Sequence, residues 1–168
     1  MGSTSQEVYS WLNQKFNNSE NGVFIDTNDF DSFDLIQDFL ELKDHQYKTP
    51  AIYYQAFPDE HLPNFILTLE EELRGKLGYY RSNSCSTMSE LISLAELKTV
   101  IIDRSYLYTW EMIDELWKWL AKYQVGVILI SSQATTHGSP ILNHPVISRW
   151  ERFIADSNLV CTLVSNPN

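Results

Sequence analysis

The chain has 168 residues, 43% of them hydrophobic and 20% charged, and its 22 acidic against 12 basic side chains give a formal net charge of -10. This length fits one compact domain, and no apolar run approaches the roughly 18 residues that cross a bilayer. The N-terminus lacks the basic flank and apolar core of a signal peptide, so we expect a cytoplasmic protein. The acidic balance repels nucleic acid and anionic lipid, and we expect neither as a direct partner.

The first segment, residues 1–21, is expected to be a leader with a short amphipathic helix, in front of a single α/β domain over residues 22–168. Apolar residues recur at helical spacing between Gln6 and Phe16. The polar run that follows, which ends at Gly22, breaks this pattern.

Beyond this segment, apolar strands and amphipathic helices alternate. Strands are predicted at residues 23–25, 51–57, 99–102, 127–130 and 159–164. Helices are predicted at residues 35–42, 62–77, 87–97 and 110–123, with a helical turn at 147–153. Gly78 is expected to end the second of these helices, and Thr87 to Glu90 forms a capping box at the start of the third. Strands that are apolar on both faces are typical of parallel sheets covered by helices, so the order predicts a three-layer α/β sandwich with a mainly parallel, five-stranded sheet.

The two cysteines do not indicate a disulfide framework or a zinc site. Cys85 and Cys161 lie far apart in the sequence, and no Cys-x-x-Cys or Cys/His cluster has the spacing of zinc ligands. We expect both to be small buried apolar groups.

Polar residues follow two neighbouring strands in the segment from Lys98 to Gln133. One apolar strand ends in Asp103, and after an intervening helix the next strand ends in Ser131 and Ser132. Ligands of parallel α/β sheets bind beyond the carboxyl ends of the strands, so these side chains are expected to face one crevice.

This segment resembles the stretch from Walker B to sensor 1 in AAA+ P-loop ATPases. Upstream, residues 49–58 are similar to the second strand of the ATPases that serve DNA transposition, the TniB/TnsC-like branch. Downstream, residues 143–150 are similar to the Ser-Arg-aromatic segment of that branch. The resemblance extends from about Gly22 to Val164 and implies a P-loop NTPase-like fold.

The place of the Walker A loop departs from this family. A Walker A loop needs glycines, which let backbone N–H groups approach phosphate, and a lysine, which neutralises its charge. Residues 26–34, which follow the first strand, contain neither Gly nor Lys but have four Asp. Carboxylates such as Asp29 and Asp31, beside Ser32 at a helix N-terminus, occupy the place of a phosphate and repel it.

The Walker B end departs as well. The catalytic Glu of the family would follow Asp103, and Arg104 stands there instead. The resemblance therefore implies a pseudo-ATPase that uses no cofactor and catalyses no reaction. Its degenerate nucleotide-site positions are Asp29, Asp31, Ser32, Asp103, Arg104, Ser131 and Ser132.

The same resemblance suggests an interface. Arg149 matches the arginine that the family presents at the subunit boundary, and Trp150 and Arg152 lie beside it. Arg with an adjacent Trp is a composition favoured at interface hot spots, so we expect a protein partner, either an AAA+ ATPase or a second copy of the chain. The alternative is that Trp150 fills the core and the two arginines balance an acidic surface.

A metal-dependent nuclease is the rival interpretation. Residues 26–28 resemble the end of the first strand of PIN-domain nucleases, where an acid holds a divalent metal. Asp26 would then need Asp103 and Asp114 to complete a carboxylate cluster. The acidic turn does not form a calcium site by itself, because Phe30 and Phe33 interrupt the spacing of oxygen ligands in an EF-hand loop.

Overall fold

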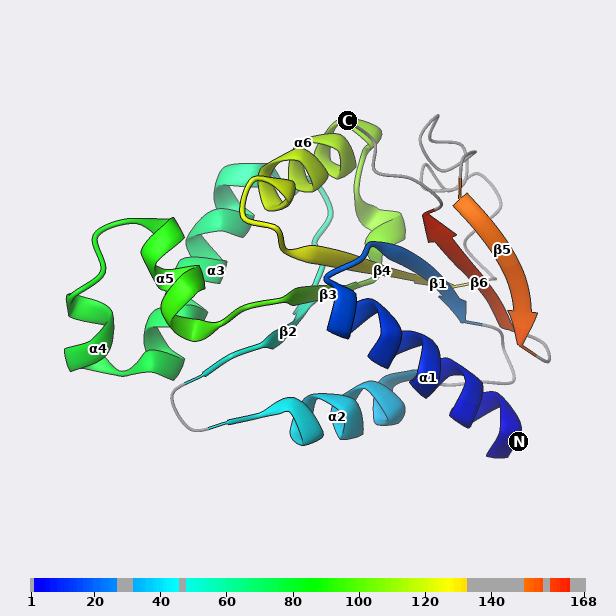
Figure 1. Cartoon of the computed structure of the whole chain (residues 1–168). Coiled ribbons are helices and arrows are strands. Elements are labelled where there is room, and N and C mark those ends of the chain that lie inside the picture. Colours follow the sequence, from blue (N-terminus) through cyan, green and yellow to red (C-terminus); the bar gives the residue numbers. More distant parts are fainter. Residues whose placement is uncertain (1, 27–31, 46–47, 133–149, 156–157, 164–168) are drawn as a thin grey trace.

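The computed structural model describes residues 2–26, 32–45, 48–132, 150–155 and 158–163 as one mixed sheet with helices on both faces (Figure 1). The strands are β1 (Gly22–Asp26), β2 (Ala51–Gln55), β3 (Thr99–Asp103), β4 (Gly126–Ser132), β5 (Trp150–Ala155) and β6 (Asn158–Leu163). The helices are α1 (Gly2–Asn18), α2 (Ser32–Lys43), α3 (Leu62–Leu77), α4 (Tyr79–Asn83), α5 (Met88–Ala95) and α6 (Trp110–Ala121), with a 3-10 turn η1 (Ser105–Leu107).

The strand order is β2-β3-β4-β1-β6-β5, and the first four strands are parallel. β6 runs antiparallel to β1, and β5 runs antiparallel to β6. The α/β class with parallel strands is as predicted. The described sheet has six strands, whereas the sequence analysis predicts five.

The additional strand is β5, which replaces most of the helical turn predicted at residues 147–153. Residues 147–149 lie outside the described part of the chain, and Trp150–Ala155 pairs with β6 so that Ala155 lies opposite Asn158. A single helical turn has little stability of its own in a stretch this short. A full ladder of backbone hydrogen bonds to a neighbouring apolar strand is therefore the more stable alternative.

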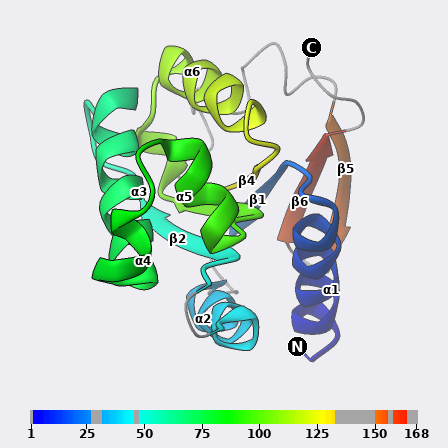
Figure 2. The ribbon, with the colours of Figure 1, turned by 60° about the vertical axis from the view of Figure 1, so that its left-hand side comes forward.

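One face of the sheet packs against α3, α5 and α6 (Figure 2). Alternate strand residues, such as Val100 and Ile102 of β3, point into this larger core and are fully buried. Ile101 lies between them and is buried on the opposite face. This alternation explains why β3 is apolar throughout, as expected for a strand covered on both sides.

The opposite face packs against α1 and α2 (Figure 2). Trp11 and Leu12 of α1 and Phe39 of α2 are buried there against β3 and β4. The N-terminal helix thus supplies part of one of the two cores, because its apolar stripe covers strands that would otherwise be exposed on that side.

Local sequence signals act as predicted at two helix ends. Gly78 adopts a positive φ of 86° after α3, and its amide donates to the carbonyl of Arg74. Thr87 caps α5 by accepting a hydrogen bond from the amide of Glu90, as predicted, whereas the Glu90 carboxylate accepts from the amide of Ser86 and not from that of Thr87 as in a full capping box. The short elements α4 and η1 were not predicted, because five and three residues are too few to display a helical period.

The link between α1 and β1 packs closely on the start of β4. The Asn21 side chain accepts a hydrogen bond of 2.8 Å from the amide of Val127. Gly126 lies so near this link that a Cβ atom on it would come within 2.6 Å of the carbonyl oxygen of Glu20.

Of the helices in the described ranges, none is both long and apolar enough to cross a membrane.

Candidate functional site

The chain connections reverse direction between β1 and β4. From β1 the chain crosses to β2 at one edge of the sheet, whereas from β4 it continues to β5 at the other edge. A ligand crevice is expected beyond the carboxyl ends of adjacent strands at such a reversal. The register places the backbone of Asp26 beside Ser132, and Ile25 beside Ser131, at this point.

Asp103 ends β3, as predicted, and both of its carboxylate oxygens accept hydrogen bonds. Oδ1 accepts from the backbone N–H of Arg104 at 2.8 Å, and Oδ2 accepts from the hydroxyl of Tyr53. Burial, followed by the hydrogen bond to Asp103, raises the pKa of Tyr53 to about 12. The neutral tyrosine therefore remains a proton donor to the carboxylate at neutral pH.

Arg104 occupies the position where the resemblance would place a catalytic Glu. It adopts a left-handed conformation with φ 55° and ψ 34°, and its side chain is exposed. The next residue, Ser105, is buried and donates a hydrogen bond of 2.8 Å to the carbonyl of Ile130 in β4. The turn after β3 is thus fixed to the neighbouring strand.

An aromatic contact brings the start of α2 to the same edge. The ring of Phe33 lies edge-on to the ring of Tyr53, with centroids 5.9 Å apart. Phe33 lies in the first turn of α2 and is 43% exposed. Three segments that are distant in the sequence therefore meet around Tyr53.

A second carboxylate at this end of the sheet was missed by the sequence analysis. Glu60 is only 8% exposed and accepts hydrogen bonds from the hydroxyls of Tyr54 at 2.6 Å and Tyr108 at 3.1 Å. It also accepts one of 3.0 Å from the amide of Phe57. Burial, with the charge of Glu60, raises the pKa values of Tyr54 and Tyr108. With three donors on one buried carboxylate, Glu60 acts as a structural anchor.

The register separates the backbones of two of the three acids of the nuclease hypothesis, Asp26 and Asp103. Asp103 is level with Phe24 of β1, so the backbone of Asp26 lies two strands across and two residues further on. Standard strand spacings make this separation about 12 Å. Asp114 belongs to α6. Within the described residues, no group of three His, Cys, Asp or Glu side chains could hold a metal ion.

Several predicted positions fall outside the described residues or are described by backbone alone. Asp29, Asp31 and Arg149 lie outside the described ranges, and Ser32 is the first residue of α2. Trp150 and Arg152 belong to β5, which forms an edge of the sheet.

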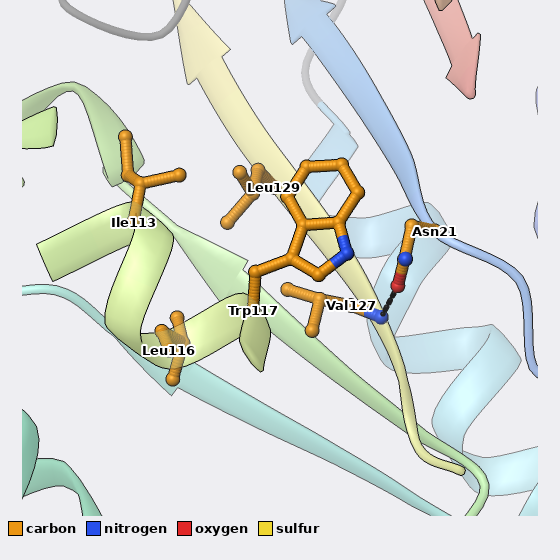
Figure 3. Close-up of a pocket in the computed structure, with 6 residues that line it drawn as sticks. All are labelled: Asn21, Ile113, Leu116, Trp117, Val127 and Leu129. Atoms are coloured by element: carbon orange, nitrogen blue, oxygen red, sulfur yellow. Dashed lines mark hydrogen bonds between the residues drawn. The ribbon is translucent and has the colours of Figure 1, made fainter. Parts of the chain in front are cut away.

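Two of the described cavities lie away from this edge. A groove of about 420 Å³ lies near the opposite end of the sheet, between α5 and the end of α6. A cavity of about 10 Å³ lies under α6, where Figure 3 shows Trp117 beside Leu129 and the Asn21–Val127 hydrogen bond. It holds no more than about one water molecule, so it is a packing space and not a ligand site.

A search with the sequence finds no matching protein family and no matching curated protein. The functional argument therefore depends on the fold and on this edge of the sheet.

Proposed function

We propose that the chain is a pseudo-ATPase: a P-loop NTPase-like domain of AAA+ type that hydrolyses no nucleotide and acts as a protein-binding or regulatory module. β1 is followed by α2, with residues 27–31 between them, and a strand followed by a helix is the order of elements between which phosphate-binding loops occur. The reversal of connections beside β1 supports the same fold.

The engagement of Asp103 is the observation that carries this proposal. A Walker B aspartate uses lone pairs of its carboxylate to hold the Mg²⁺ of a nucleotide, and a carboxylate has about four of them. In this protein Tyr53 and the amide of Arg104 each donate a hydrogen bond to one of the two oxygens, which engages two of these lone pairs and fixes the orientation of the carboxylate. Asp103 therefore stabilises the turn after β3.

Arg104 and the acidic residues at the start of α2 do not fit a bound nucleotide either. Arg104 cannot act as the general base that a water molecule needs, because its guanidinium stays protonated. Asp34 lies in the first turn of α2, and the sequence places Asp29 and Asp31 just before it. Negative charge there opposes phosphate binding at the helix N-terminus.

Calorimetric titration with Mg-ATP and Mg-ADP tests the loss of nucleotide binding. We expect no binding by the unmodified protein, nor by Asp103→Ala. Asp38→Ala, which removes an exposed acid elsewhere on α2, serves as the control. A micromolar Kd that Asp103→Ala abolishes would overturn the proposal.

Protein association is the positive part of the proposal, with Arg149, Trp150 and Arg152 at the interface. β5 forms an outer edge of the sheet, which supports an interface there, and the proposed partner is an active AAA+ ATPase or a second copy of the chain. Arg149→Ala and Trp150→Ala are expected to weaken association by about 2 kcal/mol each, as is usual for hot-spot residues. Sedimentation and pull-down measure this effect, with the exposed Lys118→Ala as control. Unchanged association in both variants would show that the interface lies elsewhere.

A further inference from the structure

β2 forms one edge of the sheet, and in the described part of the chain no strand pairs with its outer side. Backbone groups point to alternate sides along a strand. The carbonyl of Pro50 accepts hydrogen bonds from the start of β3, and the amide of Ala56 donates to the end of β3. The amides and carbonyls of Ala51, Tyr53 and Gln55 therefore point toward the open side of the sheet.

Along the described strand β2, two of the features that commonly prevent strand addition are absent, namely charged residues and proline. The sequence of the strand is Ala-Ile-Tyr-Tyr-Gln. Natural edge strands are commonly protected by charges, prolines or bulges, and an unprotected edge is a template for another strand. At the opposite edge, β5 contains Glu151 and Arg152. The two edges of the sheet thus differ in their capacity to accept a further strand.

A groove of about 250 Å³ accompanies the free edge. Figure 1 shows β2 at the margin of the sheet, with α2 on one side and α3 on the other. The groove lies between these helices along the first half of the strand, and it is lined by residues of α2, by Glu72 of α3 and by residues 49–53. This space provides room for the side chains of an added strand.

The charges along the groove favour a basic occupant. The ammonium of Lys43 lies over two phenylalanine rings of the α1–α2 face, 4.9 and 5.5 Å from their centroids, and Asp44 pairs with Lys76. Among the described residues, no cation forms an ion pair with Glu41 or Glu72. Partial burial raises the pKa of Glu72.

We propose that the outer edge of β2 binds an extended, basic segment of a partner protein, which joins the sheet as an additional strand and places Lys or Arg beside Glu41 and Glu72. Main-chain hydrogen bonds supply affinity in this mode of recognition, and the flanking charges supply selectivity. A second copy of the chain is a poorer occupant, because pairing β2 with β2 would bring the same carboxylates together on two molecules with a charge of -10 each. This site goes beyond the proposed pseudo-ATPase function and does not depend on it.

Selection of peptides from a random nonapeptide library tests the proposal. We expect the selected peptides to alternate β-branched or aromatic residues with polar ones and to contain Lys or Arg. In hydrogen exchange, a selected peptide should slow the amides of Tyr53 and Gln55 at least tenfold. Amides that already donate to β3 serve as the internal reference. N-methylation of alternate peptide residues should abolish binding in one register and leave it unchanged in the other.

Variants of the two carboxylates test the choice of a basic segment. Glu41→Gln with Glu72→Gln should raise the Kd of a selected peptide about fivefold at low salt, which corresponds to about 1 kcal/mol. Glu71→Gln, an exposed acid of α3 outside the groove, should leave the Kd unchanged.

Three results would overturn the proposal: selection yields no binder, the selected peptides lack basic residues, or their binding leaves the β2 amides unprotected. Self-association that a peptide on β2 competes away would instead assign this edge to a second copy. Failure of the pseudo-ATPase proposal is recognised separately, by Mg-ATP binding, and does not affect these readouts.

Discussion

Two consecutive tyrosines of β2 each hold a carboxylate at the carboxyl end of the sheet. Side chains alternate between the faces of a strand, so Tyr53 meets Asp103 on the α2 side and Tyr54 meets Glu60 on the α3 side. Each carboxylate also accepts a backbone N–H. Asp103 and Glu60 thus stabilise the turns that follow β3 and β2, whereas acids at this end of the sheet could hold a cation in another α/β protein.

Glu60→Ala should strongly destabilise the fold, because it leaves the hydroxyls of Tyr54 and Tyr108 and the amide of Phe57 without their acceptor. We expect a loss of about 2–4 kcal/mol in the free energy of unfolding. Urea denaturation measures it, and Glu71→Ala, at an exposed position of α3, should cost less than about 0.5 kcal/mol. Equal, small effects of the two substitutions would contradict the anchoring role of Glu60.

The raised pKa of Tyr53 predicts a loss of stability at alkaline pH. Its pKa is about 12 in the folded protein and 10.0 in the reference state, so the neutral hydroxyl favours the folded state. This contribution is fully present below pH 10 and disappears as the pH rises towards 12. Tyr54 and Tyr108 act in the same direction, because their pKa values are also raised.

Urea denaturation between pH 8 and pH 11 measures this effect. The free energy of unfolding should fall above about pH 10, and it should fall less steeply in Tyr53→Phe. A variant with the same pH dependence as the unmodified protein would show that Tyr53 ionises as freely in the folded state as in the unfolded one.

The sequence predicts that Asp103 ends a strand, but it does not predict the hydrogen-bond partners of the Asp103 carboxylate. A polar residue after an apolar strand is visible in the sequence, whereas its partner Tyr53 lies 50 residues away. Glu60 is an acid just before a helix in the sequence, and one of its hydrogen-bond partners, Tyr108, is 48 residues distant. Contacts of this kind depend on how strands are ordered in the sheet, and no local pattern records that order.

At the scale of elements, long periodic segments were predicted well. The predicted helix at residues 62–77 matches α3 (Leu62–Leu77), because its apolar stripe is long and Gly78 ends it. The predicted strand at 99–102 matches β3 to within one residue. The wrong prediction was at β5, where a few apolar residues fit a helix and a strand equally and only pairing with β6 decides between them.

Two glycines in different elements should respond to alanine in opposite ways. Gly126→Ala should cost about 2 kcal/mol or more, because the new Cβ would lie 2.6 Å from the backbone oxygen of Glu20. Gly75→Ala should stabilise the protein by about 0.5–1 kcal/mol, since the position is helical and nothing lies within 4 Å of a Cβ there. Thermal unfolding of both variants compares them directly. A neutral Gly126→Ala would mean that the α1–β1 link does not pack on β4 as described.

At the scale of the molecule, the sheet separates three regions with different proposed roles. Its carboxyl edge, around Asp103, is the proposed remnant of a nucleotide site, while β5 and β2 form the two lateral edges proposed for protein contacts. Each region is probed by substitutions of its own and by a different readout. The proposals can therefore be tested independently of one another.

Thermal unfolding of the protein and of Asp103→Asn, each alone, with Mg-ATP and with Mn²⁺, tests the central claim that Asp103 has a structural role. We expect Asp103→Asn to lower Tm by about 3 °C, through weaker hydrogen bonds to Tyr53 and Arg104. We expect neither ligand to raise the Tm of either protein, because a ligand stabilises only a fold that binds it. A rise of several degrees with Mg-ATP or Mn²⁺ that disappears in Asp103→Asn would contradict the account.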